Sequence, residues 1–324
     1  MARELVLAEG VVLQRILDAT HVIWHDGLDR TNYERWYRAQ LATPWGRLHL
    51  SRWALVAGGD FLASAKLYDL DATLDGRAIR VAGIGAVFTH EAHRGQGAAR
   101  ELIERLLDRK SREGADAALL FSEIGPEYYA RLGFEVVPTF DLRLSVVEDP
   151  RRGAPATLVR AGDDRDLDDL VAMNAIRAAP YRFHLNRDRD LVRFAIAKKR
   201  LLAGLAPPGT RALEFFIAEE GASAVAYVVI AVKDGEWTIE SAGDRDPAGA
   251  RLGAILQVLI AREPGQQRPA IQGRLPATLR PPQLRIVETK PARDVMMIRP
   301  LTGAGRPSRP LAADDVLYWR GDLF

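Results

Sequence analysis

The order strand, glycine-containing turn, helix between residues 79 and 107 is the feature that most restricts how this chain can fold. Ile79 to Thr89 is an apolar run of strand length, and a turn containing Gly95 and Gly97 follows it. Apolar residues then recur at helical spacing, namely Leu102, Ile103, Leu106 and Leu107. A strand that leads through a short turn into a helix is typical of layered α/β folds, so we expect an α/β protein with a mixed sheet.

The turn also predicts a binding site, because it exposes the start of a helix. The first N–H groups of a helix have no partner within the helix, and the helix dipole attracts negative charge to this end. Gly95 and Gly97 let a ligand approach the backbone closely, and Arg94 adds a positive charge, so a pyrophosphate is the natural ligand. The glycine patterns of P-loop and dinucleotide-binding folds are absent. A tight turn without a ligand is the structural alternative.

Further patterns on both sides of this motif suggest two similar halves. The first half is predicted to contain two helices within 11–40, a strand hairpin over 48–56 and 61–70, a short strand 117–121, a short helix 126–132 and strands 134–138 and 140–147. The second half repeats the order helix, strand hairpin, strand, helix over 163–179, 215–232, 237–242 and 248–262. Glu148 to Pro155 is the best linker candidate, so we expect domains at 1–149 and 156–324.

Composition excludes several classes of protein. The chain has no cysteine, which rules out disulfides, thiolate metal sites and cysteine nucleophiles. Its 45 basic and 43 acidic side chains are interspersed and leave a net charge of +2, so we expect no nucleic-acid partner. The densest basic run, Lys198-Lys199-Arg200, is interpreted as a solvated helix end. No apolar run is long enough to span a membrane and no leader sequence precedes the first strands, which favours a cytoplasmic protein without a membrane partner.

Residues 86–99 resemble the signature of the GCN5-related N-acetyltransferase (GNAT) superfamily. The core of that signature, Gln/Arg-x-x-Gly-x-Gly/Ala, is matched by Arg94, Gly97 and Ala99. A second family feature, a tyrosine near a helix end followed by a Gly-Phe strand start, is matched by residues 129–134. The resemblance covers about 48–147. Glu91 departs from it, since proline is common there, and places a negative charge near the expected phosphate site.

The resemblance implies a GNAT fold and acetyl-CoA as a co-substrate, with no metal. It assigns coenzyme binding to Val87, Phe88, Thr89, Arg94, Gly95, Gln96, Gly97, Ala98 and Ala99. It also implies that Tyr129 protonates the departing CoA thiolate, a role that suits a phenol that is neutral at pH 7. The base that deprotonates the amine stays open between Glu123, His90, the carboxylate of Phe324, as in two-domain relatives of the enhanced-intracellular-survival type, and water.

Two functions follow from these observations. The first is an N-acetyltransferase that moves the acetyl group of acetyl-CoA to an amine of a small molecule or peptide by direct attack in a ternary complex. The second is a non-catalytic acyl-CoA sensor or scaffold, and the presence of Tyr129 favours the enzyme.

The second half lacks the arginine and paired glycines at residues 244–253, so we interpret it as a degenerate GNAT-like domain. His21, His25 and Asp26 are interpreted as a polar helix face or an acceptor-side wall near Trp24, and not as a metal site. The sequence predicts neither the acceptor nor the oligomeric state.

Overall fold

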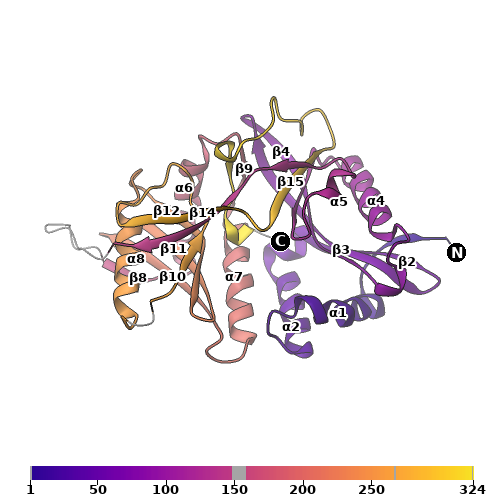
Figure 1. Cartoon of the computed structure of the whole chain (residues 1–324), viewed down its shortest axis with the longest axis horizontal. Helices are drawn as coiled ribbons and strands as arrows, with labels where there is room; N and C mark the ends of the chain where they lie inside the picture. Colours follow the sequence, from indigo (N-terminus) through magenta and orange to yellow (C-terminus); the bar gives the residue numbers. More distant parts are fainter. Residues whose placement is uncertain (1, 148–157, 266–267, 323) are drawn as a thin grey trace. The chain divides into compact units, whose positions relative to one another are not determined.

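The computed structural model describes residues 2–147, 158–265, 268–322 and 324. Contacts within it divide the chain into two compact units. The first unit contains the described residues of 1–138 together with 293–312 and Phe324, and the second contains 139–292 and 313–323. Each unit is built around its own mixed sheet, and the two are described in turn (Figure 1).

The first unit has a sheet with helices on both faces. Its helices are α1 (Gly10–Trp24), α2 (Arg30–Ala42), α3 (Pro44–His49), α4 (Ala98–Arg112) and α5 (Glu127–Ala130). Its strands are β1 (Glu4–Leu7), β2 (Leu50–Ala57), β3 (Asp60–Leu74), β4 (Arg77–Thr89), β5 (Ala117–Ser122), β6 (Glu135–Val137) and β15 (Val295–Pro300). They lie in the order β1-β2-β3-β4-β5-β15-β6, and only the β4–β5 pair is parallel.

The alternation of side chains along β2 and β3 determines which helix covers which face. Leu102 and Leu106 of α4 are fully buried against Ala65 and its neighbours on one face. Ile16 of α1 packs with Ala54 of β2 on the other face. The buried apolar stripe of α4, predicted from residues 102–107, is confirmed. It fixes the start of α4 beside the end of β4, which is where the candidate site lies.

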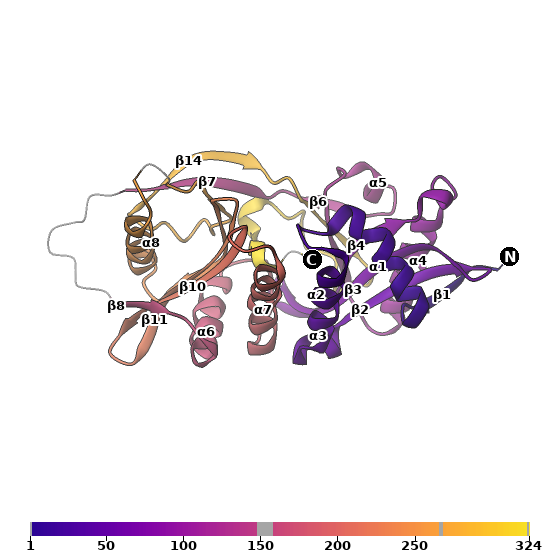
Figure 2. The ribbon, with the colours of Figure 1, turned by 90° about the horizontal axis from the view of Figure 1, so that it is seen from below.

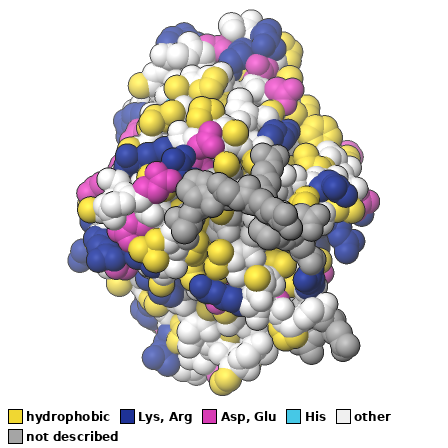
Figure 3. Space-filling view, turned by 90° about the vertical axis from the view of Figure 1, so that its left-hand side faces the viewer, with side chains coloured by type: hydrophobic (Ala, Val, Ile, Leu, Met, Phe, Trp, Pro, Cys, Tyr) yellow, Lys and Arg dark blue, Asp and Glu magenta, His cyan; other side chains and the backbone are white. Residues whose placement is uncertain are grey.

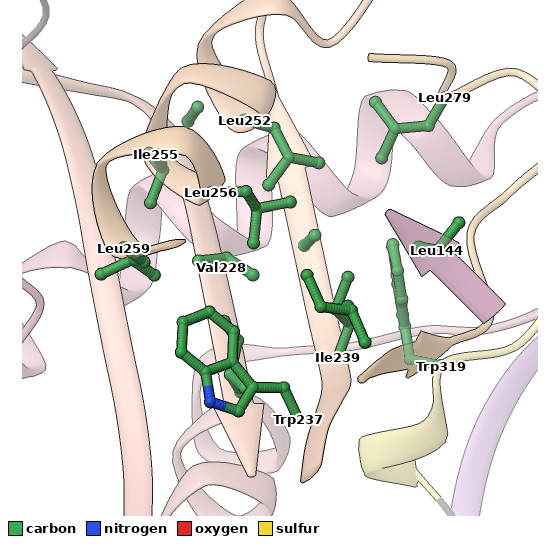
Figure 4. Packing of buried hydrophobic residues seen from close by; sticks show 14 of the residues in the cluster. Leu144, Val228, Trp237, Ile239, Leu252, Ile255, Leu256, Leu259, Leu279 and Trp319 are labelled. Carbon is green, nitrogen blue, oxygen red and sulfur yellow. The ribbon is translucent and has the colours of Figure 1, made fainter. Parts of the chain in front are cut away.

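The second unit contains α6 (Leu167–Ala178), α7 (Arg189–Leu205) and α8 (Ala250–Arg262). Its strands are β7 (Phe140–Val146), β8 (Leu158–Ala161), β9 (Phe183–Leu185), β10 (Arg211–Glu220), β11 (Ser223–Lys233), β12 (Glu236–Asp244), β13 (Ile271–Gly273), β14 (Leu284–Pro291) and β16 (Val316–Leu317). The short helices η2 (Asp164–Asp166), η3 (Ala313–Asp315) and η4 (Arg320–Asp322) complete it. Trp237, Ile239 and Leu256 lie in its core, between the sheet and α8 (Figure 4).

The two sheets share one plan, which confirms the tandem layout predicted from the repeated order of elements. The second sheet runs β8-β10-β11-β12-β13-β7-β14, and again only one pair, β12–β13, is parallel. Each parallel pair occupies the same place in its sheet. In each sheet, the first strand of the parallel pair also carries one extra residue relative to its antiparallel neighbour. This holds for β4 relative to β3 and for β12 relative to β11.

One strand of each sheet comes from the other half of the sequence, which the sequence analysis did not foresee. Residues 140–147 were expected to complete the first sheet, but β7 pairs with β13 and β14 of the second, and Figure 2 shows β7 and β14 side by side. In return, β15 lies between β5 and β6. The compact units therefore differ from the contiguous ranges 1–149 and 156–324. The linker predicted at 148–155 lies outside the described residues.

The basic run at 198–200 is a correction to the sequence analysis. It lies within α7 and not at its end, and Lys198 is buried beside the ring of Phe194 at 5.9 Å from the ring centroid. Burial lowers the pKa of Lys198 to about 8. On the face drawn in Figure 3, basic and acidic side chains are intermixed, as the composition suggested. Among the described residues, no helix is long and apolar enough to cross a membrane.

Candidate coenzyme site

The end of β4 opens away from its parallel neighbour. The pairing of β4 with β5 stops at Ile84 and Leu120, although β4 continues to Thr89. Between Gly85 and Phe88, β4 carries one residue more than β3, and Ala86 has a φ of 47°. The bulge and the interrupted pairing leave an opening in the sheet beside the last residues of β4.

Backbone N–H groups at this opening have a definite direction. The N–H of His90 donates to the Leu62 carbonyl oxygen at 2.9 Å, and Phe88 pairs with Ser64 of β3. Alternate residues of an antiparallel strand direct their polar backbone groups to opposite sides. Thr89, between them, therefore directs its N–H group away from β3 and toward the opening.

The glycine turn ends in a helix start whose donors are free. Gly95 has a φ of 74° and Gly97 a φ of 75°, a region that favours glycine, and Gly97 is the N-cap of α4. No side chain caps this end, and no atom lies within 4 Å of where a Cβ of Gly97 would stand. The N–H of Arg94 donates to the Glu91 carbonyl oxygen at 3.2 Å. Only its side chain is free to meet a phosphate.

These parts meet in one cavity of about 520 Å³ within the first unit. It is lined by Ile23, Trp24, Val87, Phe88, Thr89, His93, Arg94, Gly95, Gly97, Ala98, Ala99, Arg100, Ile124, Tyr128 and Tyr129. Every predicted coenzyme-binding residue except Gln96 is in that set. Gln96 instead accepts from Arg3 through its carbonyl oxygen, at 3.3 and 3.4 Å, and so ties the turn to the segment before β1.

Tyr129 stands in the wall of this cavity and is 8% exposed. Its ring packs edge-on against those of Tyr128 and Phe134. No hydrogen bond of its hydroxyl to any described residue is seen. Burial raises the pKa of Tyr129 to about 12, so the hydroxyl keeps its proton at neutral pH. A neutral phenol beside the opening of the sheet can donate to an atom that gains negative charge.

The candidate bases are not gathered at the cavity. Glu123 follows β5 with its side chain exposed, and it is not among the lining residues. His90 lines a different cavity, where its ring meets the edge of Phe61. Phe324 lies on β4: its carbonyl carbon is 2.7 Å from where a Cβ of Gly85 would stand, so only glycine fits there. Its ring packs 4.7 Å from that of Tyr68.

The helix α1 adds an aromatic and apolar wall to the cavity, near the place where the sequence analysis allowed an acceptor-side wall beside Trp24. Trp24 packs edge-on against Phe88 at 6.2 Å, and Ile23 beside it is 52% exposed. The helical spacing of α1 predicted its buried face but carried no signal for residues that face a ligand. The nearby His21 and His25 make local hydrogen bonds to Leu28 and Gly27. Among the residues that the structure describes, no group of three or more metal-ligating side chains is found.

The equivalent place in the second unit is filled by the protein itself. Asp244, at the end of β12, is 4% exposed and accepts from the N–H groups of Asp246 and Leu252, both at 2.8 Å. The carboxylate thus occupies the start of α8, where an anion would bind. A Cβ on Gly249 would also stand 2.7 Å from Leu279. These contacts support the interpretation of the second half as a domain without a coenzyme site.

Comparisons with known proteins agree with this architecture. Residues 22–137 match the family model described as an acetyltransferase (GNAT) domain. No curated protein matches the chain. Two solved structures with similar folds are titled GCN5-related N-acetyltransferase. The one from Kribbella flavida is 17% identical with a TM-score of 0.67, over 92% of this chain and 71% of that one. The one from Anabaena variabilis is 13% identical with a TM-score of 0.69, over 93% and 73%.

A third solved structure shares the fold over most of both chains. Eis1 from Mycobacterium abscessus is 14% identical with a TM-score of 0.54, over 93% of this chain and 74% of that one. At such identities the likeness establishes the fold alone. The family match covers the strand, glycine turn and helix that build the cavity. Residues 22–137 therefore match a GNAT domain, and the likeness to the solved structures shows that the chain shares their fold.

Proposed function

We propose that the protein is an N-acetyltransferase that moves the acetyl group of acetyl-CoA to an amine. The observation that carries the proposal is the single cavity that joins the free start of α4, the opening of the sheet beside Thr89, and Tyr129. A site with these three parts offers an anion-binding end, backbone donors for a carbonyl oxygen, and an acid. A coenzyme sensor would need only the anion-binding end.

In the proposed complex, the pyrophosphate lies at the start of α4, where the N–H groups of Gly97, Ala98 and Ala99 point at it. The guanidinium groups of Arg94 and Arg100 add positive charge at the same end of the cavity. The pantetheine arm follows β4 toward the opening of the sheet. The thioester carbonyl accepts from the backbone near Val87 and Thr89. No metal takes part in the proposed reaction.

The reaction is a direct transfer. The nitrogen of a neutral amine attacks the thioester carbon, and the carbonyl oxygen becomes an oxyanion that the N–H of Thr89 stabilises. When the tetrahedral intermediate collapses, the C–S bond breaks and Tyr129 donates its proton to the sulfur, which leaves as the CoA thiol. A base takes the proton that the amine nitrogen loses. The acetyl group thus passes directly from the sulfur to the nitrogen, without a covalent enzyme intermediate.

Phe324 is the best placed of the candidate bases. In a chain that ends at Phe324, its terminal carboxylate lies over Gly85, one residue before the bulge of β4. We expect that two glycines added after Phe324 lower kcat at least about 10-fold, with acetyl-CoA affinity unchanged, because the carboxylate becomes a neutral amide. Steady-state rates compared with a Phe324→Tyr variant, which keeps the carboxylate, check this. Equal rates for the extended and the original chain would exclude Phe324 as the base.

The proposed function is tested by titration calorimetry with acetyl-CoA, followed by a screen of amines for acetyl transfer. Micromolar binding together with transfer to at least one amine supports the enzyme. Binding without transfer to any amine would favour the sensor or scaffold. The absence of binding would mean that the fold is present without its coenzyme site.

A further inference from the structure

Arg52 of β2 is a buried cation whose hydrogen-bonding groups are only partly used. It is 2% exposed, and its Nη2 lies 3.4 Å from the Ser64 hydroxyl. Its Nε and Nη1 have no hydrogen-bond partner among the described residues, and it forms no ion pair with their carboxylates. An arginine stays charged in proteins, and an unpaired buried charge destabilises the fold by several kcal/mol. Such a group requires an explanation in terms of function.

The surroundings of Arg52 are aromatic and charged, and Phe324 lies over Gly85, the partner of Lys66 on β4. Lys66 lies directly opposite it on β3, where two like charges repel. The ring of Tyr37 lies beneath both side chains, 5.8 Å from the Arg52 Cζ and 5.4 Å from the Lys66 Nζ. Burial lowers the pKa of Arg52, and the nearby Tyr37, Tyr33 and Tyr68 oppose this shift, Tyr33 also through a hydrogen bond. We name Arg52, Lys66, Tyr37 and Tyr68 the Arg52 cluster.

The Arg52 cluster is aligned with the opening of the sheet through directly paired residues on neighbouring strands. Lys66 pairs with Arg52 on one side and with Gly85 of β4 on the other, so the three positions share one face of the sheet. This face is the one covered by α1, opposite α4. At about 4.8 Å per strand, Arg52 stands roughly 10 Å from Gly85. A small molecule whose amine reaches the opening could place a second group at Arg52.

We propose that the Arg52 cluster binds a carboxylate of the acceptor, so that the acceptor is an amine that also carries an acid group. The inference rests on the proposed acetyltransferase function. A carboxylate would supply the acceptor atoms that Nε and Nη1 lack. The rings of Tyr37 and Tyr68 favour a flat or apolar body between the amine and the acid.

The first test compares two amines that differ only in the acid group, 4-(aminomethyl)benzoate and 4-(aminomethyl)benzamide. We expect the wild type to acetylate the benzoate with a kcat/KM about 10- to 100-fold higher than that of the benzamide, the range for a charge-assisted contact. Arg52→Met should lower the kcat/KM for the benzoate to that for the benzamide. Arg35→Met, on the exposed side of α2, should behave as the wild type.

The second test measures binding without transfer. In thermal unfolding, 4-(aminomethyl)benzoate should raise the Tm of the wild type and not that of Arg52→Met, since a ligand stabilises only the form that binds it. The variant is expected to fold, because replacing a buried charge by an apolar chain is often neutral or stabilising. Arg52→Lys, which keeps a cation, provides a second variant that should retain part of the preference.

The outcomes separate this inference from the proposed function. If the wild type treats both amines alike, or if Arg52→Met keeps the preference for the benzoate, Arg52 is a structural cation and the inference is wrong. If the benzoate raises the Tm only of the wild type but no amine of the wider screen is acetylated, the carboxylate site stands and the proposed function fails. If there is neither acetyl transfer nor a rise in Tm, both the carboxylate site and the proposed acetyltransferase function are overturned.

Discussion

Replacing Gly97 with glutamate is expected to lower the affinity for acetyl-CoA at least about 100-fold. Gly97 is the N-cap of α4 and lines the cavity, with open space where its Cβ would stand. A carboxylate there would face the pyrophosphate at the site where the helix start should bind it, and like charges at short range repel by about 1–4 kcal/mol. Titration calorimetry of both proteins with acetyl-CoA measures the difference.

Gly76→Glu is the matched control for this variant. Gly76 has the same φ of 75°, also has no atom within 4 Å of its Cβ position, and lies in the turn between β3 and β4, away from the cavity. Both variants introduce the same side chain at the same strained backbone conformation, so both should lose similar stability. Only Gly97→Glu should lose binding. An unaltered affinity in Gly97→Glu would place the coenzyme elsewhere.

Replacing Tyr129 with phenylalanine is expected to lower kcat roughly 100- to 1,000-fold, in the range for loss of a general acid. Acetyl-CoA affinity should hardly change, because the ring keeps its packing against Tyr128 and Phe134. A loss confined to kcat is the sign of an interaction made in the transition state. Tyr128→Phe removes a neighbouring hydroxyl from the same cavity and serves as the control. Equal turnover in wild type and Tyr129→Phe would remove Tyr129 from the mechanism.

The pH dependence provides a second measurement on the same residue. The fold raises the pKa of Tyr129 to about 12, above the value of 10 for a free tyrosine, because burial disfavours the phenolate. The stabilisation from keeping Tyr129 neutral is therefore complete below pH 10 and is lost as pH rises through 12. Absorbance titration of the phenolate, compared between wild type and Tyr129→Phe, should show no ionisation of Tyr129 below about pH 11.

The sequence predicted the glycine turn and its helix well, because those signals are local. The positions of Gly95 and Gly97 and the apolar spacing of Leu102 and Leu106 each restrict the backbone within a few residues. The exchange of β7 and β15 was not predictable in this way, since a strand alternates in the same manner whichever sheet receives it.

The parts of the site that no local pattern records depend on contacts between distant residues, and Phe324 was named only through the family resemblance. Phe324 fits on β4 only because Gly83 and Gly85 leave room for it, a match across about 240 positions that no local pattern records. Arg52 looks like an ordinary polar residue of a strand until its burial and its missing partners are seen. The prediction that residues 198–200 form a solvated helix end was wrong for the same reason. A run of basic residues does not indicate which of them is buried, as Lys198 is.

The exchange of strands also affects how the protein is made on the ribosome. The strand β6 pairs with β15, whose residues 295–300 are synthesised long after those of β6. The first sheet then stays incomplete at its β5 edge while the second half is translated, and an unpaired edge attracts other strands. A nascent chain halted after residue 147 should therefore expose the edge of β5, and the first unit should complete its sheet only after residues 295–300 have left the ribosome.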